Sequence, residues 1–324
     1  MLFEIVLFAG ASKTQNLETI ANKRFSLRLK DYMQLTKPSL SIMVVFSSVI
    51  SYLLAPKVVA FDWVMIALLF TGGFLVTGSA NTINQVVEKA TDATMKRTAG
   101  RPVASGRMSE MEGWTFAVIT GIAGVAILTF FFNALSGALA AFSLFLYAFV
   151  YTPLKKVNSI AVLVGAVPGA MPCLIGWAAG NDSVFPDGGG VQDWGGWVLF
   201  FIQFLWQFPH FWAIAWVAHK DYSSAGFRLL PAEKGPTKFT AIQTIMYAVL
   251  LIPVCVLPFV IDLTDYSGTR GTVCLALIML SNIFLVVQCI RLYQEMDPKA
   301  ARRVMFSSYI YLPVVLLTLL AGKM

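Results

Sequence analysis

Long apolar segments separated by short polar connections run along the whole chain. A helix of roughly 20 apolar residues spans the hydrocarbon core of a membrane. Nine segments have this length and character: residues 39–55, 63–87, 113–132, 134–152, 159–179, 194–218, 239–261, 271–290 and 304–322. Backbone groups in lipid must be hydrogen-bonded within the protein, so each segment is expected to be an α-helix. The pattern predicts an all-α polytopic membrane protein with about nine transmembrane helices around a central cavity.

Composition agrees with this class. Of the 324 residues, 57% are hydrophobic and 13% are charged, and the mean hydropathy is +0.72. A soluble globular protein carries about 25% charged residues, and a water-soluble fold would leave these apolar surfaces exposed. The four cysteines all fall within the predicted helices without a CxxC pair. They are expected to be buried and to pack as small apolar residues.

The distribution of basic residues predicts the topology. Twenty-one of the 24 Lys and Arg residues lie before the first segment or in alternate connections, and only Lys57, Arg270 and Lys323 lie on the other side. Positively charged loops stay in the cytoplasm, so the N-terminus is predicted inside and the C-terminus outside. The net charge of +7 follows from this topology and needs no nucleic-acid partner.

Residues 1–38 are predicted to be a cytoplasmic extension, and residues 39–324 to be the transmembrane domain. The apolar stretch Leu2 to Ala11 resembles the core of a signal peptide, but Glu4 interrupts it and no basic residue precedes it. A signal peptide is therefore the less favoured alternative. The lack of an Arg- and Ser-rich, acid-poor leader favours a bacterial inner membrane over an organellar one.

A first polar cluster follows the second segment. Asn84, Glu88 and Asp92 are spaced by four residues, so on a helix they share one face. Three oxygen ligands suit Mg²⁺, which takes its other ligands from water and phosphate oxygens. Three bases that can bind phosphate follow directly: Lys96, Arg97 and Arg101. This order predicts a site for a metal-bound diphosphate. The alternative is an amphipathic helix end in which Asp92 pairs with Lys96.

A second polar cluster follows the sixth segment, on the same predicted side of the membrane. It contains Lys220, Asp221, Tyr222 and Arg228. Asp221 is a candidate ligand of a second ion, and the other three are candidate phosphate contacts. Tyr151 and Lys155, at the end of the fourth segment, add a third edge to this face. Parallel second and sixth helices with polar ends indicate an internal repeat around one cavity. Considered alone, the second cluster also fits a solvated loop.

Three polar or aromatic residues lie at membrane depth within the sixth segment: Trp206, Gln207 and His210. Polar side chains at that depth face protein, a cavity or a ligand. They are candidates for contact with a large flat substrate. A hydrogen bond from His210 to a neighbouring helix explains the same pattern, and the sequence leaves both interpretations open.

Several motifs together resemble the UbiA-type superfamily of intramembrane prenyltransferases, and within it the branch that farnesylates heme. The superfamily motif is the ladder Asn84, Glu88 and Asp92. The branch motifs are Met95-Lys-Arg-Thr98 with Arg101-Pro102, and Trp206-Gln-Phe-Pro-His-Phe211. Further matching stretches are Leu35-Thr-Lys-Pro38, Tyr151-Thr152, Leu154-Lys155, Gly169-Ala-Met-Pro172, Ile175-Gly-Trp177, Asp221-Tyr222, Ala225-Gly226 and Leu230-Pro231. The resemblance extends from about residue 32 to the C-terminus.

The resemblance implies transfer of a farnesyl group from farnesyl diphosphate to a vinyl group of protoheme IX (heme B), giving heme O and diphosphate. It implies Mg²⁺ at Asn84, Glu88 and Asp92, with Asp221 as a further metal ligand and catalytic residue. The implied diphosphate contacts are Tyr151, Lys155, Tyr222, Lys220 and Arg228 together with Lys96, Arg97 and Arg101. The implied heme contacts are Trp206, Gln207 and His210. Contact with heme A synthase or cytochrome oxidase assembly is a further implied partnership.

Three other functions compete with this one. A related enzyme could prenylate an aromatic quinone precursor with the same diphosphate machinery. A secondary transporter is disfavoured because transporters place ionisable residues near the membrane midplane, whereas here they cluster at one interface. A non-catalytic heme-binding assembly factor leaves the acid ladder unexplained.

Overall fold

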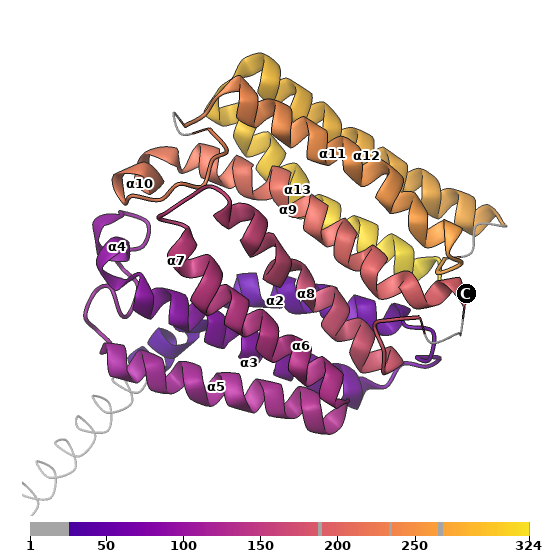
Figure 1. Cartoon of the computed structure of the whole chain (residues 1–324), viewed down its shortest axis with the longest axis horizontal. Coiled ribbons are helices and arrows are strands. Elements are labelled where there is room, and N and C mark those ends of the chain that lie inside the picture. Colours follow the sequence, from indigo (N-terminus) through magenta and orange to yellow (C-terminus); the bar gives the residue numbers. More distant parts are fainter. Residues whose placement is uncertain (1–25, 187–189, 233–234, 265–267, 324) are drawn as a thin grey trace, which may run out of the picture.

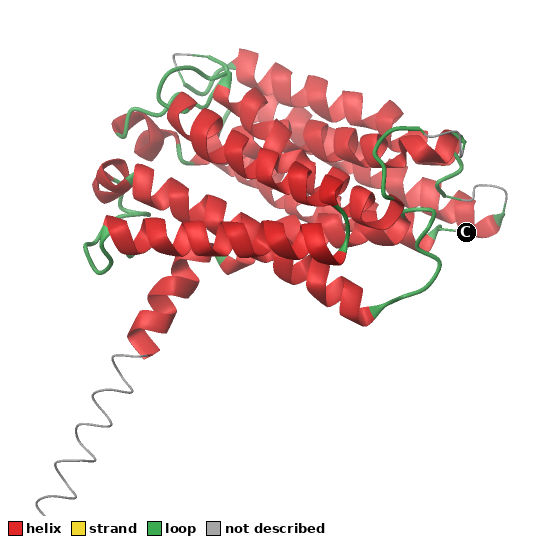
Figure 2. Cartoon of the chain, turned by 60° about the horizontal axis from the view of Figure 1, so that its bottom comes forward, coloured by secondary structure: helices red, strands yellow, loops and turns green. Residues whose placement is uncertain are grey.

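The computed structural model describes residues 26–186, 190–232, 235–264 and 268–323, and every regular element in these ranges is a helix (Figure 2). The apolar stretch from Leu2 to Ala11, and with it the choice between an extension and a signal peptide, lies outside the described residues. The connections between helices gather at the two ends of the bundle. The prediction of an all-α polytopic membrane protein is confirmed.

Eight helical segments among the described residues have the length and apolar character to cross a membrane. They are α3 (Trp63–Val87), α5 (Glu110–Phe131), the segment Ala134–Leu154, α8 (Ala161–Asn181), Val191–Val217 with α9 (Gly195–Val217), α11 (Lys238–Val260), α12 (Thr269–Glu295) and α13 (Pro298–Ala321). A ninth arises when α2 (Pro38–Leu54) is joined to the helix Ser26–Thr36, from which it is bent by 48°. The count agrees with the nine segments of the sequence.

The last helix differs most from its predicted start. We predicted a start at residue 304, but α13 begins at Pro298 because Asp297 accepts a hydrogen bond from Ala300 N at 2.6 Å. An Asp N-cap followed by proline is a strong start signal for a helix. Helix α12 likewise continues five residues beyond residue 290, to Glu295.

Helices that are neighbours in the chain pack together, and so do several that lie far apart in it (Figure 1). Helix α3 packs against α5, α8 against both α2 and α9, and α9 against α11 and α13. Helix α13 also contacts α2, which closes the arrangement. Helices α8 and α9 are the most buried of the candidate spans. They therefore form the centre of the molecule.

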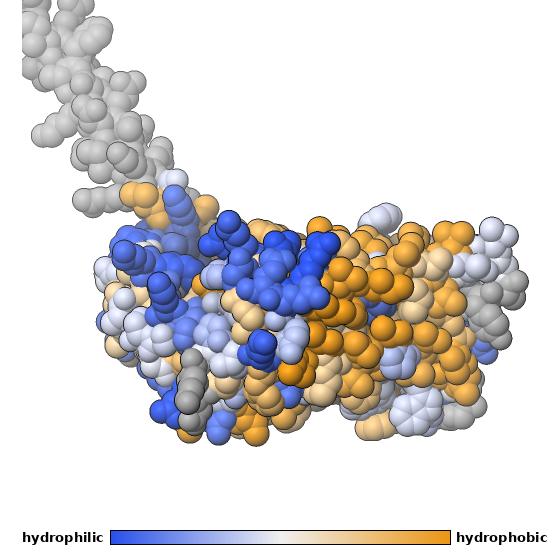
Figure 3. Space-filling model, turned by 90° about the horizontal axis from the view of Figure 1, so that it is seen from above, coloured by the Kyte–Doolittle hydropathy of each residue, from blue (hydrophilic) through white to orange (hydrophobic). Residues whose placement is uncertain are grey.

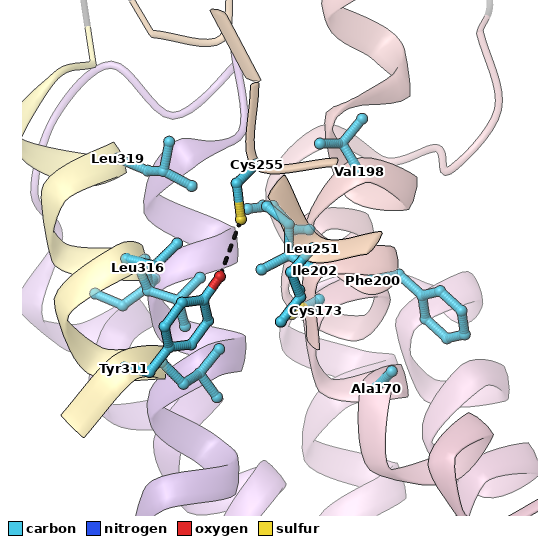
Figure 4. Packing of buried hydrophobic residues seen from close by; sticks show 14 of the residues in the cluster. Ala170, Cys173, Val198, Phe200, Ile202, Leu251, Cys255, Tyr311, Leu316 and Leu319 are labelled. Atoms are coloured by element: carbon cyan, nitrogen blue, oxygen red, sulfur yellow. Dashed lines mark hydrogen bonds between the residues drawn. The ribbon is translucent and has the colours of Figure 1, made fainter. Parts of the chain in front are cut away.

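Buried side chains of α8, α9, α11 and α13 fill the space between the central helices (Figure 4). One polar chain crosses this apolar region: Tyr311 donates from its hydroxyl to Asn282 Oδ1 at 2.9 Å, and Cys255 Sγ lies 3.1 Å from the same hydroxyl. All four cysteines are free and buried, as the sequence predicted.

Polar and apolar surfaces are separated along the long axis (Figure 3). Hydrophilic side chains gather at the end that carries α4 (Lys89–Thr94) and α10 (His219–Ser224), on the left in Figures 1 and 3. Large apolar side chains such as Phe130 and Ile122 are exposed along the helices. Such an apolar belt fits contact with lipid. The structure does not place either end relative to the cytoplasm, so the orientation stays a prediction.

Candidate functional site

The acid ladder lies where α3 breaks and continues as α4. Glu88 is the junction, with φ −93° and ψ 11°, and the main-chain hydrogen bonds from Glu88 N to Asn84 O (3.0 Å) and from Asp92 N to Glu88 O (2.7 Å) persist across it. The exposed fractions of Asn84, Glu88 and Asp92 are 3%, 6% and 0%. The three side chains therefore face the protein interior, in agreement with the spacing.

Lys155 joins the upper part of the ladder. Its Nζ lies 2.6 Å from Asn84 Oδ1 and 2.5 Å from Glu88 Oε1, while Asn84 Nδ2 donates to Glu88 Oε2 at 2.7 Å. Lys155 follows a six-residue π-helical turn, Leu146–Tyr151, and the short α7 (Thr152–Leu154). Such turns occur often at functional sites. Here the turn ends the fourth span with Lys155 directed at the ladder.

Asp92 pairs with the loop that follows α4. Arg101 NH1 lies 2.5 Å from Asp92 Oδ2, and Thr98 Oγ1 donates to the main-chain oxygen of Asp92 at 2.8 Å. The other carboxylate oxygen, Asp92 Oδ1, is buried and accepts no hydrogen bond within the described residues. A buried oxygen of this kind is costly unless a donor or cation satisfies it.

Burial and charge shift the ionisation of these groups. Burial raises the pKa of Asp92 above its usual range, and the charge of Arg101 partly opposes this effect. Burial lowers the pKa of Lys155, against the attraction of Glu88. Burial, together with repulsion from Arg101 and Lys155, lowers the pKa of Lys37 to about 7. The site therefore holds its basic groups at an electrostatic cost, which an added anion would relieve.

These residues line a pocket of about 150 Å³ at the polar end of the bundle. Its polar lining residues are Lys37, Asn84, Glu88, Asp92, Arg97, Thr98, Arg101, Tyr147, Tyr151, Lys155 and Tyr222. Four permanent or potential cations face two carboxylates, so the pocket has an excess of positive charge. It can bind a polyanion, and its carboxylate and amide oxygens can at the same time hold a hard cation.

Both polar clusters of the sequence contribute to this pocket. Arg97 NH2 lies 3.1 Å from the hydroxyl of Tyr222, and the Arg97 guanidinium lies 5.4 Å from the centre of the Tyr222 ring. Phe227 and Leu229 complete the wall on the same side. The convergence predicted for the ends of the second and sixth segments is thus present in the structure.

Four of the predicted metal and diphosphate contacts are not part of the pocket lining. Lys96 and Lys220 are exposed, and Asp221 is half-buried on α10. Arg228 lines a neighbouring cavity. A second metal ion at Asp221 therefore stays a prediction from the sequence. No group of three or more His, Cys, Asp or Glu side chains in the described part of the chain is arranged to hold a metal.

Sequence reasoning did not assign Lys37 and Tyr147 to this site. Lys37 has a left-handed backbone, with φ 46°, at the bend before α2. Gln85 Nε2 donates to Leu35 O at 2.9 Å and Asn81 Nδ2 to Thr36 O at 3.3 Å, so α3 holds this bend in place. In the sequence, Lys37 could have been recognised from the Lys-Pro pair that directly precedes a predicted span. Tyr147 could have been recognised because it lies four residues before Tyr151 and so shares a helix face with it.

The candidate heme contacts on α9 face two different helices. Gln207 Nε2 donates to Ala166 O of α8 at 3.1 Å. His210 Nδ1 lies 2.8 Å from Ser308 Oγ of α13, and the Trp206 ring stacks on the His210 ring at 4.7 Å. Trp206 Nε1 donates to Ser308 O at 2.8 Å. Each has a protein partner, and their role in heme binding stays a prediction.

The sequence matches the model of the UbiA prenyltransferase family over residues 44–310. The chain belongs to this family. It is therefore a prenyltransferase, in agreement with the excess of basic side chains in the pocket. Family membership also agrees with the resemblance to UbiA-type prenyltransferases that the sequence showed in the acid ladder and in the basic residues that follow it.

Curated relatives of this UbiA-family protein share much of its sequence. The protoheme IX farnesyltransferase of Cytophaga hutchinsonii is 40% identical over 90% of this chain and 97% of the relative. That of Flavobacterium johnsoniae is 40% identical over 90% of this chain and 94% of the relative. That of Legionella pneumophila is 34% identical over 92% and 96%.

Solved structures share the fold at lower identity. A digeranylgeranylglyceryl phosphate synthase aligns with a TM-score of 0.71 at 21% identity, covering 91% of this chain and 98% of that one. A UbiA homologue from Archaeoglobus fulgidus, bound to GPP and Mg²⁺, aligns with a TM-score of 0.64 at 14% identity, covering 89% and 99%. These likenesses establish the UbiA fold for this chain.

Proposed function

We propose that this protein transfers the farnesyl group of farnesyl diphosphate to a vinyl group of heme B, which yields heme O and releases diphosphate. The observation that carries the proposal is the pocket in which Asn84, Glu88 and Asp92 lie beside four basic side chains at the polar end of a membrane bundle. The acceptor is inferred from curated relatives that bear the name protoheme IX farnesyltransferase.

The donor site fits a Mg²⁺ ion and a diphosphate. Asn84 Oδ1, the carboxylate of Glu88 and the unpartnered Asp92 Oδ1 supply the oxygen ligands that Mg²⁺ prefers. Such an ion would neutralise part of the diphosphate charge. Arg97, Arg101, Lys155 and Lys37 share the rest, and the related Archaeoglobus protein binds GPP with Mg²⁺.

The residues of this chain act on the leaving group. As the C1–O bond of farnesyl diphosphate breaks, its electron pair goes to the diphosphate, and the basic side chains stabilise the charge that develops there. The vinyl π electrons of heme form the new carbon–carbon bond to C1. Water then adds to the resulting carbocation and loses a proton, which leaves a hydroxyl. Tyr147 and Tyr151 offer aromatic rings beside the pocket that favour an allylic cation.

The distribution of basic residues and the bacterial relatives support a location for the protein and for its polar end. The chain is a multi-pass membrane protein, and we place its polar end on the cytoplasmic face of a bacterial inner membrane. Farnesyl diphosphate is a water-soluble anion with an apolar tail, so a pocket at the interface suits it. We also propose that the protein contacts heme A synthase or cytochrome oxidase assembly proteins, which would receive the heme O product.

An assay with purified protein tests the proposal directly. Heme B, farnesyl diphosphate and Mg²⁺ are incubated with the protein in detergent, and the product is weighed by mass spectrometry. We expect a product heavier than heme B by one farnesyl group and one hydroxyl group, and no product after chelation with EDTA. Prenylation of 4-hydroxybenzoate in place of heme would overturn the proposed acceptor and support the quinone-precursor alternative.

A further inference from the structure

A second cavity, larger than the diphosphate pocket, lies next to it. Its volume is about 470 Å³, and it is bounded by residues 156–159, by the junction of α9 with α10, and by residues 226–232. The volume falls within the usual range of small-molecule sites. The proposed chemistry at the diphosphate pocket does not use this space.

The charged side chains that line this cavity are basic. Lys156 and Arg228 contribute to the lining together with His219, and none of the described lining residues is an Asp or Glu. Arg228 is exposed and forms no ion pair with another described residue. Lys156 Nζ donates to the hydroxyl of Thr91, a neutral partner that leaves the lysine charge uncompensated. The cavity therefore favours an anion.

The bases lie at the wall that separates this cavity from the diphosphate pocket. Tyr222, Phe227 and Leu229 line both spaces. The Nζ atoms of Lys155 and Lys156 lie 5.7 Å and 5.9 Å from the centre of the Phe227 ring. Lys155 lines the pocket, whereas Lys156 lines the cavity. Cations of both spaces therefore contact the same layer of side chains.

The main chain holds these cations together. The N–H of Arg228 donates to Lys155 O at 2.9 Å, which ties the loop that carries Arg228 to the segment that carries both lysines. The positive charges thus continue from the diphosphate pocket across the shared wall into the larger cavity. An anion that leaves Lys155 on this side meets Lys156 and Arg228 next, so positive charge accompanies it throughout.

We propose that the larger cavity is a second binding site for inorganic diphosphate, which it receives from the diphosphate pocket after farnesyl transfer. This inference rests on the proposed function, because that reaction releases diphosphate beside the shared wall. Lys156 and Arg228 bind the phosphate oxygens through charge-assisted hydrogen bonds. The wall consists of side chains, and rotation of Tyr222 and Phe227 opens it to the leaving anion.

The two sites differ in what they offer a metal ion. The diphosphate pocket has the oxygen ligands of Asn84, Glu88 and Asp92, whereas no carboxylate of the described residues lines the larger cavity. Diphosphate in the pocket is therefore expected to bind together with Mg²⁺, and diphosphate in the cavity to bind without it. This contrast distinguishes the two sites in solution.

Equilibrium dialysis of radiolabelled inorganic diphosphate against the purified protein in detergent counts the sites. The wild type is compared with Arg228→Gln and Lys156→Gln, each measured with Mg²⁺ and after chelation with EDTA. The control is Arg302→Gln, which removes an exposed charge at the start of α13, away from the cavity lining. A charge-assisted hydrogen bond contributes roughly tenfold or more to affinity.

We expect the wild type and Arg302→Gln to bind two diphosphate ions with Mg²⁺ and to keep one of them in EDTA. Arg228→Gln and Lys156→Gln should weaken this Mg²⁺-independent site about tenfold or more. Both variants should keep the Mg²⁺-dependent site, which also shows that they are folded. A single site in the wild type would overturn the inference. Two sites of unchanged affinity in both variants would overturn it as well.

A lipid headgroup carries the same phosphate chemistry, so the dialysis is repeated in nanodiscs of phosphatidylcholine and of phosphatidylglycerol. Retention of the Mg²⁺-independent site in both lipids supports free diphosphate as the ligand. Loss of this site in phosphatidylglycerol alone would overturn the inference in favour of an anionic lipid.

Heme farnesylation, measured on the same preparation, separates this inference from the proposed function. Farnesylation of heme by a protein with one diphosphate site would overturn the second site alone. Two sites in a protein that does not farnesylate heme would support the second site and overturn the proposed acceptor.

Discussion

Lys155 occupies the point where the acid ladder and the basic pocket meet. Its ammonium contacts both Asn84 Oδ1 and Glu88 Oε1, which are two of the proposed Mg²⁺ ligands. A divalent ion at these oxygens would repel Lys155 and direct it toward the phosphate oxygens. One side chain can thus serve the ladder in one state and the diphosphate in the other. Arg101 has the same relation to Asp92.

Asp92 is the residue whose charge the proposed donor site needs most. We expect Asp92→Asn to lower kcat by about 10²–10³-fold, because an amide keeps the shape but not the charge that holds Mg²⁺. Initial rates at saturating heme and farnesyl diphosphate measure this effect, and the Mg²⁺ concentration for half-maximal rate should rise.

Glu110→Gln is the matched control for Asp92→Asn. Glu110 is an exposed acid at the start of α5, paired with Lys89 at 3.0 Å. Its substitution should leave the rate within about twofold of the wild type, since exposed ion pairs contribute little. Wild-type turnover in Asp92→Asn would contradict the metal assignment.

His210 offers a second test at the residue scale. Its hydrogen bond to Ser308 joins α9 to α13, and interhelical bonds of this kind contribute about 0.5–2 kcal/mol in membranes. We expect His210→Ala and Ser308→Ala both to lower the midpoint of thermal unfolding, and unchanged heme affinity in both variants would assign His210 to packing alone. Loss of heme affinity in His210→Ala alone would instead support its predicted role as a heme contact.

The sequence predicted the site residues that share a helical spacing and missed those brought in by a bend. Asn84, Glu88 and Asp92 could be found because a four-residue spacing on a helix fixes a common face. Lys37 could not, because its place depends on a left-handed backbone and on Asn81 and Gln85, which belong to another helix. Periodicity contains no information on such contacts.

The ends of α3 and α9 are built alike at the element scale. Each long helix breaks at one residue and continues as a six-residue helix, with φ −93° and ψ 11° at Glu88 and φ −94° and ψ 14° at Ala218. Four residues beyond each break lie Asp92 and Tyr222, and both line the pocket. Asp221 lies one position earlier, and one residue turns a helix by about 100°. This offset explains why Asp221, the predicted second metal ligand, does not line the pocket, whereas Tyr222, a predicted phosphate contact, does.

Close packing of α8 against α2 gives a test at the same scale. A Cβ atom added at Gly176 would lie 1.9 Å from the main-chain oxygen of Ser48, which cannot rotate away. We expect Gly176→Ala to separate α8 from α2 and to destabilise the protein by about 1–3 kcal/mol. The midpoint of thermal unfolding in detergent measures the effect.

Gly100→Ala is the control for Gly176→Ala. Nothing lies within 4 Å of a Cβ built at Gly100, and its φ is not in the left-handed region. This variant should unfold at the wild-type temperature. Equal stability of both variants would show that α8 and α2 are not in the close contact described.

At the scale of the whole molecule, the apolar segments predict the helix count and the distribution of basic residues predicts the orientation. The span count of eight or nine agrees with nine apolar segments because the requirements of a membrane act on each segment separately. The packing order of the helices was not predictable in the same way. It depends on contacts such as that of α13 with α2, between segments far apart in the chain.

Labelling with a membrane-impermeant maleimide tests the orientation. The four native cysteines are buried, so an introduced cysteine reports its own side. We introduce Cys at Ser105, exposed in the loop after α4 at the polar end, and at Val59, which is 92% exposed in the connection from α2 to α3.

With the basic loops in the cytoplasm, intact bacterial cells should label Val59→Cys and protect Ser105→Cys, whereas permeabilised cells should label both. The native protein without an added cysteine sets the background. The reverse pattern in intact cells would place the diphosphate pocket on the outer face of the membrane, where a substrate made in the cytoplasm could not reach it. The proposed donor could then no longer be farnesyl diphosphate from the cytoplasm.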